Sequence, residues 1–361
     1  MWILAVYLAR TVIFASLVAL VAILALDLVF ALADGVADGG KGTGDVLFAA
    51  LLGAPELALE AFPFATLIGS LMGLGGLAAR QELTAMRGAG VSVAQIAGAV
   101  LAGGLVLALL ASAIGEYLVP AAERQVAAQK GIDETDKLRA QPGGALWARD
   151  GSDFLRVERP RSRFHLQSVT IYRFADGQLS QRISAEDAFY EEGGWRLEQV
   201  EVTRFDPRGV GQEQLESWYW AADLRPDLLG LVVAEPQSLS ATDLWQYIRY
   251  LESNELESSQ YRLALWEKVA TPLATLAMLL VTIPLVFTAV RSAGAGQRIV
   301  VGILVGAAFF LINRALGQAG IVYGLAPSVA ALLPVALFFL LGRAGLPRVR
   351  CGNRRGGGVN S

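Results

Sequence analysis

Cysteine and histidine are almost absent from the sequence, which has one residue of each. Cys351 has no second cysteine to pair with, so no part of the fold depends on an intrachain disulfide. His165 alone cannot supply a histidine pair for metal ligation, and a Ser-His-Asp triad would have to be built around it. Because a single histidine is usually an ordinary surface residue, we predict neither a metal site nor a catalytic residue.

The sequence also lacks the motifs by which proteins bind nucleotides or hydrolyse substrates. No G-x-x-x-x-G-K-[ST] stretch occurs, because residues 39–42 (Gly-Gly-Lys-Gly) lack both the leading spacing and the hydroxyl. Neither G-x-S-x-G nor H-E-x-x-H is present. A net charge of -3 does not favour nucleic-acid binding. We therefore expect this chain to bind no cofactor and no nucleic acid.

Charged residues are scarce and apolar residues abundant. The chain is 54% hydrophobic and 17% charged, with a mean hydropathy of +0.47, so part of its solvent is lipid. Six apolar runs approach the roughly 20 residues that cross a bilayer: 11–33, 51–79, 96–119, 269–290, 299–316 and 322–341. No small-residue cleavage site follows the first run, which predicts a retained helix rather than a signal peptide.

Prolines and acidic residues mark the limits expected for two of these runs. Pro55 and Pro63, with Glu56 and Glu60, suggest a polar or broken start for the second run. The third run is expected to end at Glu116 and Pro120.

Residues 120–261 have a different character, with frequent charges and no run that could cross a bilayer. Short segments of alternating polarity are separated by turn dipeptides, which predict hairpins: Asp150-Gly151, Asp176-Gly177 and Gly193-Gly194. Several short strands with regular turns favour a β-sandwich, jelly roll or barrel. Leu244, Tyr247, Ile248 and Leu251 then recur at a period near 3.6, which predicts an amphipathic helix leading back to the membrane.

Basic residues are distributed unevenly between the short segments that join the runs. Ten arginines fall on one side: Arg10, Arg80, Arg87, Arg291, Arg298, Arg343, Arg348, Arg350, Arg354 and Arg355. The other side has only Lys41 in its short segments. The positive-inside rule therefore places both termini in the cytoplasm and the β domain outside, which is the periplasm if the cell is Gram-negative.

The predicted organisation has four parts. Residues 1–119 and 262–343 form the membrane domain, and residues 120–261 form the inserted β domain with its helical return segment. Residues 344–361 form a basic cytoplasmic tail that we expect to be disordered.

A polar break at residues 79–92 separates the second and third runs. As a helix it would place Leu83 and Met86 on one apolar ridge, with Glu82 in the first turn, where the helix dipole favours a carboxylate. Gly88 and Gly90 would end this helix. The break has two interpretations: an ordinary arginine-bearing cytoplasmic loop, or a binding element for a partner protein.

Residues 81–92, Gln-Glu-Leu-Thr-Ala-Met-Arg-Gly-Ala-Gly-Val-Ser, resemble the coupling helix of the LptF/LptG permeases, which export lipopolysaccharide in Gram-negative bacteria. Further similarities follow in order along nearly the whole chain: 62–64, 71–75, 114–116, 146–151, 247–251, 261–263, 266–268, 272–273, 325–327 and 332–334. The stretch before the fourth run favours the LptG branch, with the LptF branch as the alternative.

The resemblance implies a permease subunit of an ABC-type exporter rather than an enzyme. An LptF-like permease would pair with it, and an LptB ATPase dimer would bind the ATP and Mg²⁺. Lipopolysaccharide would leave the outer leaflet of the inner membrane and pass through a periplasmic β-jellyroll to LptC and the periplasmic bridge. Two alternatives stay open: an intramembrane enzyme that modifies envelope lipids through Asp27, Glu56 or Glu60, and a scaffold that displays the β domain.

The resemblance also implies site residues on both faces of the membrane. Six residues are expected at the ATPase: Arg80, Glu82, Leu83, Met86, Arg87 and Gly90. Among these, Glu82 would meet a basic residue of LptB, while Leu83 and Met86 would fill its groove.

For the lipid, Phe62, Trp266 and Phe310 match positions near the cavity or its gate. Lys41 is the one basic residue near the outer end of the first helix, where the family often has several lysines. We therefore expect Arg314 to take over part of the phosphate contact, because a guanidinium pairs bidentately with phosphate. The alternative is that Arg314 only snorkels to the headgroups.

Overall fold

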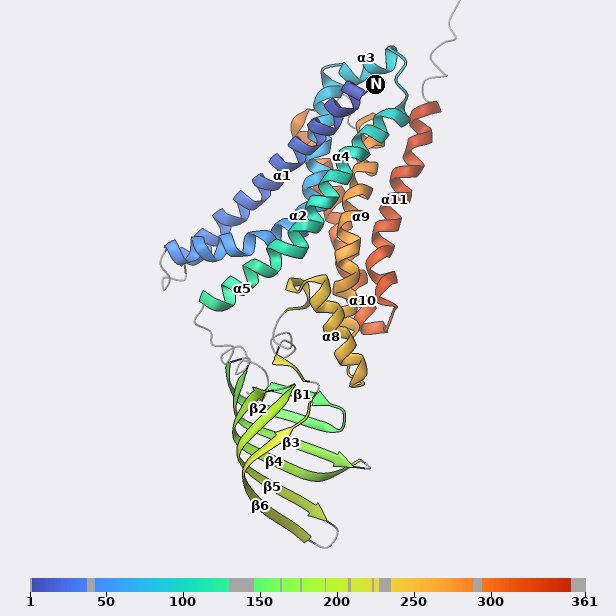
Figure 1. The fold of residues 1–361 in the computed structure, drawn as a ribbon. Coiled ribbons are helices and arrows are strands. Elements are labelled where there is room, and N and C mark those ends of the chain that lie inside the picture. The colour runs from blue at the N-terminus through green and yellow to red at the C-terminus, as the bar shows by residue number, and fades with distance from the viewer. Residues whose placement is uncertain are drawn as a thin grey trace, which may run out of the picture. The chain divides into compact units, whose positions relative to one another are not determined.

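The computed structural model describes residues 2–37, 43–129, 146–162, 164–175, 177–191, 193–206, 209–222, 224–226, 235–287 and 294–351. The chain divides into two compact units. Residues 1–122 and 262–361 form a helical membrane unit, and residues 123–261 form a unit built on a β-sheet. Figure 1 shows the first in blue to cyan and orange to red, and the second mainly in green and yellow.

Six helices in the described part of the chain are long and apolar enough to span a membrane, which confirms the six predicted crossings. Their bounds are α1 Trp2–Ala37, α2 Thr43–Ala79, α4 Val93–Ala113, α9 Ser259–Phe287, α10 Ala295–Tyr323 and α11 Pro327–Cys351. Most extend beyond the apolar runs, because helical hydrogen bonding continues past the residues that lipid requires to be apolar. Helix α11 includes the first part of the tail that was expected to be disordered.

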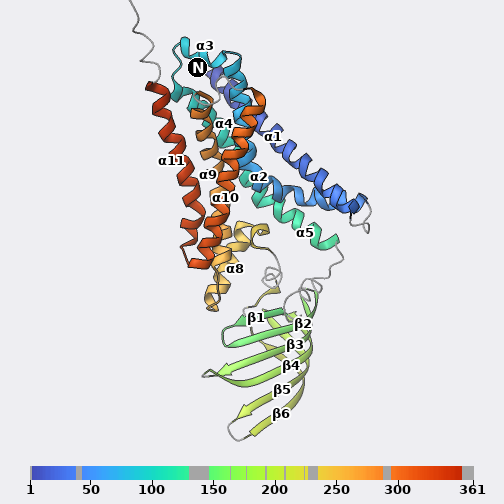
Figure 2. The same cartoon turned by 180° about the vertical axis from the view of Figure 1, so that it is seen from behind.

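Two helix limits differ from those expected at prolines. Helix α2 continues through Pro55 and Pro63, and both views show it changing direction along its length (Figures 1 and 2). The third crossing continues from α4 through a π-helical turn, Ile114–Leu118, into α5, Val119–Gln129, so Pro120 does not end it. A wider turn before a proline accommodates the missing N–H and the bulky ring.

Small residues allow the membrane helices to approach closely. A Cβ on Gly69 of α2 would lie 2.4 Å from the Cα of Ser16 in α1. One on Gly103 of α4 would lie 3.0 Å from the Cα of Ala9, also in α1. Such contacts bring backbones together where the surrounding lipid provides little hydrophobic driving force.

Over its described residues the β unit has one antiparallel sheet of six strands in the order β1-β2-β3-β4-β5-β6. The strands are β1 Leu146–Asp150, β2 Asp153–Ser162, β3 His165–Ala175, β4 Gln178–Glu191, β5 Gly194–Asp206 and β6 Gly209–Trp220. This confirms the all-β insertion. The connectivity is a meander rather than the Greek-key order of a jelly roll, because each short turn pairs a strand with the next in sequence.

Helix α8, Ala241–Ser253, supplies apolar residues to the core of the β unit, and its buried face confirms the predicted amphipathic period. Tyr247, Tyr250 and Leu251 pack with the buried side chains of the sheet. Two hydrogen bonds attach the end of the helix to the β1–β2 hairpin: Tyr250 Oη donates to Arg149 O at 2.7 Å, and Gly151 N donates to Asn254 Oδ1 at 2.7 Å.

Candidate functional site

The polar break after α2 forms a seven-residue helix, α3, Glu82–Gly88, and Glu82 lies in its first turn as predicted. Sharp bends bound it on both sides, with φ of 61° at Gln81 and 91° at Gly90. Helix α4 then begins with a capping box in which Gln95 N donates to Ser92 Oγ and Ser92 N donates to Gln95 Oε1. The helix is thus closely confined between two membrane crossings.

Helix α3 is fastened to the membrane unit by its apolar ridge. Leu83 is 2% exposed and belongs to the core of this unit, and Met86 packs partly buried against the same core. The burial of Leu83 differs from the expectation that it fills a groove of the ATPase, since a side chain buried in its own chain is not free to enter another, whereas Met86 keeps part of its surface accessible. The exposed residues of the segment are Arg80, Gln81, Thr84, Ala85, Gly88, Ala89 and Gly90.

The charged side chains of α3 contact two different membrane helices. Tyr7 Oη in α1 donates a hydrogen bond to Glu82 Oε2 at 2.9 Å. The Arg87 guanidinium lies 5.7 Å from the ring centroid of Phe287 in α9, a cation–π geometry. Glu82 remains partly exposed and, within the described part of the chain, forms no ion pair with Arg80 or Arg87. Its charge is therefore not neutralised locally.

The residues expected at the lipid occupy different environments. Trp266 on α9 is 37% exposed and Phe310 on α10 is 44% exposed, while Phe62 on α2 is 2% exposed. Phe62 therefore belongs to the packed core rather than to an open cavity wall. Arg314 is exposed on α10, and Lys41 lies outside the described residues.

A group of charged residues near Arg314 was not predicted as a site. Glu267 on α9 interacts electrostatically with Arg314 and with Glu60 on α2. The neighbouring Lys268 donates from Nζ to Gly115 O at 2.9 Å, in the π-helical turn. The sequence signal for this group is the adjacent pair of charged residues, Glu267 and Lys268, within a membrane-spanning helix. The arrangement places the Glu267 carboxyl group near Arg314 and leaves the Arg314 side chain accessible.

Carboxylates elsewhere in the membrane unit do not assemble a metal centre. Among the described residues, no three His, Cys, Asp or Glu side chains come together as a metal ion would require. Asp27 and Glu60 are exposed and Glu56 is partly buried.

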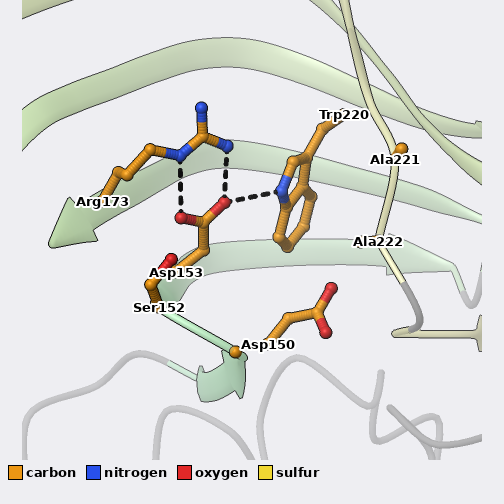
Figure 3. A pocket seen from close by; sticks show the side chains of 8 residues that line it. Asp150, Ser152, Asp153, Arg173, Trp220, Ala221 and Ala222 are labelled. Carbon is orange, nitrogen blue, oxygen red and sulfur yellow. Dashed lines mark hydrogen bonds and ion pairs between the residues drawn. The ribbon is translucent and has the colours of Figure 1, made fainter. Parts of the chain in front are cut away.

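The β unit contains a polar pocket of about 490 Å³ where the β1–β2 turn meets the end of β6. Figure 3 shows Asp153 at its wall, with both carboxylate oxygens occupied. Arg173 donates to Asp153 at 2.9 Å and 2.7 Å, and Trp220 Nε1 donates at 3.0 Å. The hydrogen bonds that Arg173 donates to the Asp153 carboxylate raise the pKa of the Arg173 guanidinium. These contacts tie three strands together, so Asp153 is not a free acid or base.

The single histidine also has structural contacts. His165 Nε2 lies 2.6 Å from Asp187 Oδ1, and its ring stacks on Phe189 with centroids 4.4 Å apart. These are cross-strand neighbours on β3 and β4, a common way in which side chains stabilise a sheet.

Six candidate membrane spans in the described part of the chain, a short helix between the second and third and a sheet inserted after the third define a multi-pass membrane protein with an inserted β unit. The model of the family "Lipopolysaccharide export system permease LptF/LptG" matches residues 6–348, and the chain belongs to this family. It is therefore a transport permease of the inner membrane.

Individual relatives agree with the family match. The chain is 33% identical over 349 residues to the lipopolysaccharide export system permease protein LptG of Escherichia coli K12, covering 93% of this chain and 95% of that protein. It is 32% identical over 348 residues to LptG of Haemophilus influenzae Rd, with the same coverage. The resemblance predicted from the sequence is thus confirmed.

Proposed function

We propose that the chain is the LptG-type permease subunit of an ABC-type exporter. In this role it extracts lipopolysaccharide from the outer leaflet of the inner membrane and passes it to LptC and a periplasmic bridge. The observation that carries the proposal is the family match over nearly the whole chain, together with a compact helix, α3, at the position of the coupling segment. Because the sequence has no P-loop, a separate LptB dimer binds ATP and Mg²⁺ and hydrolyses the nucleotide.

The number of crossings supports the orientation. A chain with six crossings has both termini on one face, and α3, which follows the second crossing, lies on that same face. The β unit follows the third crossing and therefore lies on the opposite face. The ten arginines of the terminal and α3 face assign it to the cytoplasm, which leaves the β unit in the periplasm.

Uneven burial supports a second permease subunit as partner. Only 17% of the most apolar window of α1 and of α10 is buried, compared with 61% for α9. Helices that face only lipid need no partner, but a half-transporter must present two helices to a paralogous subunit to enclose a cavity. We assign α1 and α10 to this interface, with an LptF-like chain opposite.

We assign the lipid contacts from the exposure of the aromatic and basic side chains. Phe310 and Trp266 present exposed aromatic surface suited to acyl chains, and Phe62 supports α2 from within the core. Arg314 on α10 would bind a lipopolysaccharide phosphate together with Lys41. A photocrosslinker at position 314 should form lipopolysaccharide adducts during ATP-driven transport. A strong adduct from position 41 with none from 314 would show that Arg314 only snorkels.

On the cytoplasmic face, Glu82 would pair with a basic residue of LptB. Arg80 and the bend at Gly90 would shape the exposed contact surface, while Leu83, Met86 and Arg87 hold α3 to the membrane unit. Glu82 is thus the partly exposed acidic contact with the ATPase, and Leu83, Met86 and Arg87 attach α3 to the membrane unit.

The test is a charge reversal in the assembled complex. Glu82→Lys should still insert and copurify with the LptF-like chain, but lipopolysaccharide release from proteoliposomes should fall at least tenfold. Arg343→Glu is the control, because it reverses an exposed cytoplasmic charge outside α3. Normal binding of LptB and normal transport by Glu82→Lys would refute the coupling role.

A further inference from the structure

Glu82 is an isolated acidic residue on a face of the membrane unit that otherwise has basic residues. Four segments are assigned to the cytoplasmic face: 1–10, 79–95, 288–298 and 342–361. They contain ten arginines, and Glu82 is their only side-chain carboxylate. In such surroundings an arginine would be the expected partner, because a charge-assisted bidentate pair is the strongest contact open to a carboxylate.

The structure gives Glu82 a neutral partner instead. Tyr7 Oη donates to Oε2 at 2.9 Å, across 75 positions of sequence. Arg87, one turn further along α3, stacks on Phe287 rather than turning back to Glu82. A phenol fixes the direction of a carboxylate without cancelling its charge. The carboxylate is therefore held in one direction while partly exposed, and Oε1 is left for a cation from another chain.

We infer that Tyr7 is a positioning residue for Glu82, which it orients toward the ATPase while joining the first membrane helix to the coupling segment. This inference rests on the proposed function and adds a residue that no motif of the segment contains. Figures 1 and 2 both show the N-terminal end of α1 beside α3. Helix α3 is thus attached to α1 through Glu82, to the core through Leu83 and to α9 through Arg87.

A double-mutant cycle in the assembled exporter tests the inference. Tyr7→Phe removes only the hydroxyl, and we expect it to weaken binding of the ATPase dimer about fivefold, the factor that corresponds to one ordinary hydrogen bond of ~1 kcal/mol. Lipopolysaccharide released per ATP hydrolysed should fall with it. In a Glu82→Gln background Tyr7→Phe should have almost no further effect on affinity, because the oriented charge is already gone.

Two measurements separate positioning from general packing. The thermal midpoint of Tyr7→Phe should match that of the unmodified protein, since the change removes only a hydroxyl, and its one described hydrogen bond is exposed. Tyr323→Phe is the matched control, because it removes the hydroxyl of another exposed tyrosine of the membrane unit, and its ATPase affinity should be unchanged.

The outcomes distinguish this inference from the proposed function. If Glu82→Gln lowers affinity but Tyr7→Phe does not, or if the two effects add fully, the positioning role is refuted and the coupling role stands. If Glu82→Gln itself binds the ATPase and transports normally, the coupling role fails and the role of Tyr7 fails with it.

Discussion

Gly69 offers a quantitative test of how the first membrane helix is held. A Cβ added there would lie 2.4 Å from Ser16 Cα and 2.5 Å from both Ala15 O and Ser16 N. All three are backbone atoms of α1, so no rotamer change can relieve the overlap. Ordinary carbon contacts lie near 3.5–4.0 Å, so α1 and α2 must separate by about 1 Å in Gly69→Ala.

Overpacking of this kind typically costs about 1–3 kcal/mol, and we expect the upper part of that range because backbone must move. The assay is thermal unfolding of the purified chain in detergent, followed by tryptophan fluorescence. Gly53→Ala is the matched control, since Gly53 lies on the same helix with no atom within 4 Å of its Cβ position. Alanine should be neutral or stabilising there by up to about 1 kcal/mol. Equal midpoints for the two variants would show that α1 and α2 do not meet as described.

Three further predictions concern other contacts. Asp153→Ala leaves three donor groups, two of Arg173 and one of Trp220, without their acceptor and should destabilise the β unit by about 2–3 kcal/mol. Amide exchange in β2 and β3 should become faster, and Asp153→Asn should lose less stability. Burial raises the pKa of Tyr250 to about 12. The stability that the neutral Tyr250 phenol contributes is therefore complete below about pH 10 and is lost as pH rises through 12. A fluorescence titration to alkaline pH should show an unfolding transition that Tyr250→Phe weakens. Lys268→Met removes the donor to Gly115 O and should raise amide exchange in the π-helical turn, while Lys268→Arg largely preserves protection.

Local patterns were sufficient to predict most of the fold. Length and hydropathy identify the six crossings, and glycine turns identify the hairpins, because each signal lies within a few adjacent residues. The helical period in α8 and the first-turn position of Glu82 are equally local. The end expected at Pro120 was wrong because a π-helical turn, formed upstream of the proline, lets the helix continue.

The environment of each site residue was less predictable. An apolar ridge such as Leu83 and Met86 fits the groove of a partner or the core of its own chain equally well by composition, and only packing shows that it faces inward. Phe62 is a similar case, because the sequence does not distinguish an aromatic residue that faces the protein core from one that lines a lipid cavity. The hydrogen bond between Tyr7 and Glu82 joins distant parts of the sequence, so no local pattern reveals it.

The attachments of α3 lead to helices that differ widely in burial. Helix α9, reached through Arg87 and Phe287, is 61% buried over its apolar window, whereas α1, reached through Tyr7, is only 17% buried. Displacing α9 would disturb packing on most of its sides, whereas α1 is packed mainly on one side, against α2 and α4, through close contacts such as Gly69 with Ser16. A short helix confined by bends at Gln81 and Gly90 absorbs little of an applied movement itself. Movement imposed on α3 should therefore reach α1 together with α2, which is packed closely against it, and α1 is one of the two helices assigned to the interface with the paralogous subunit.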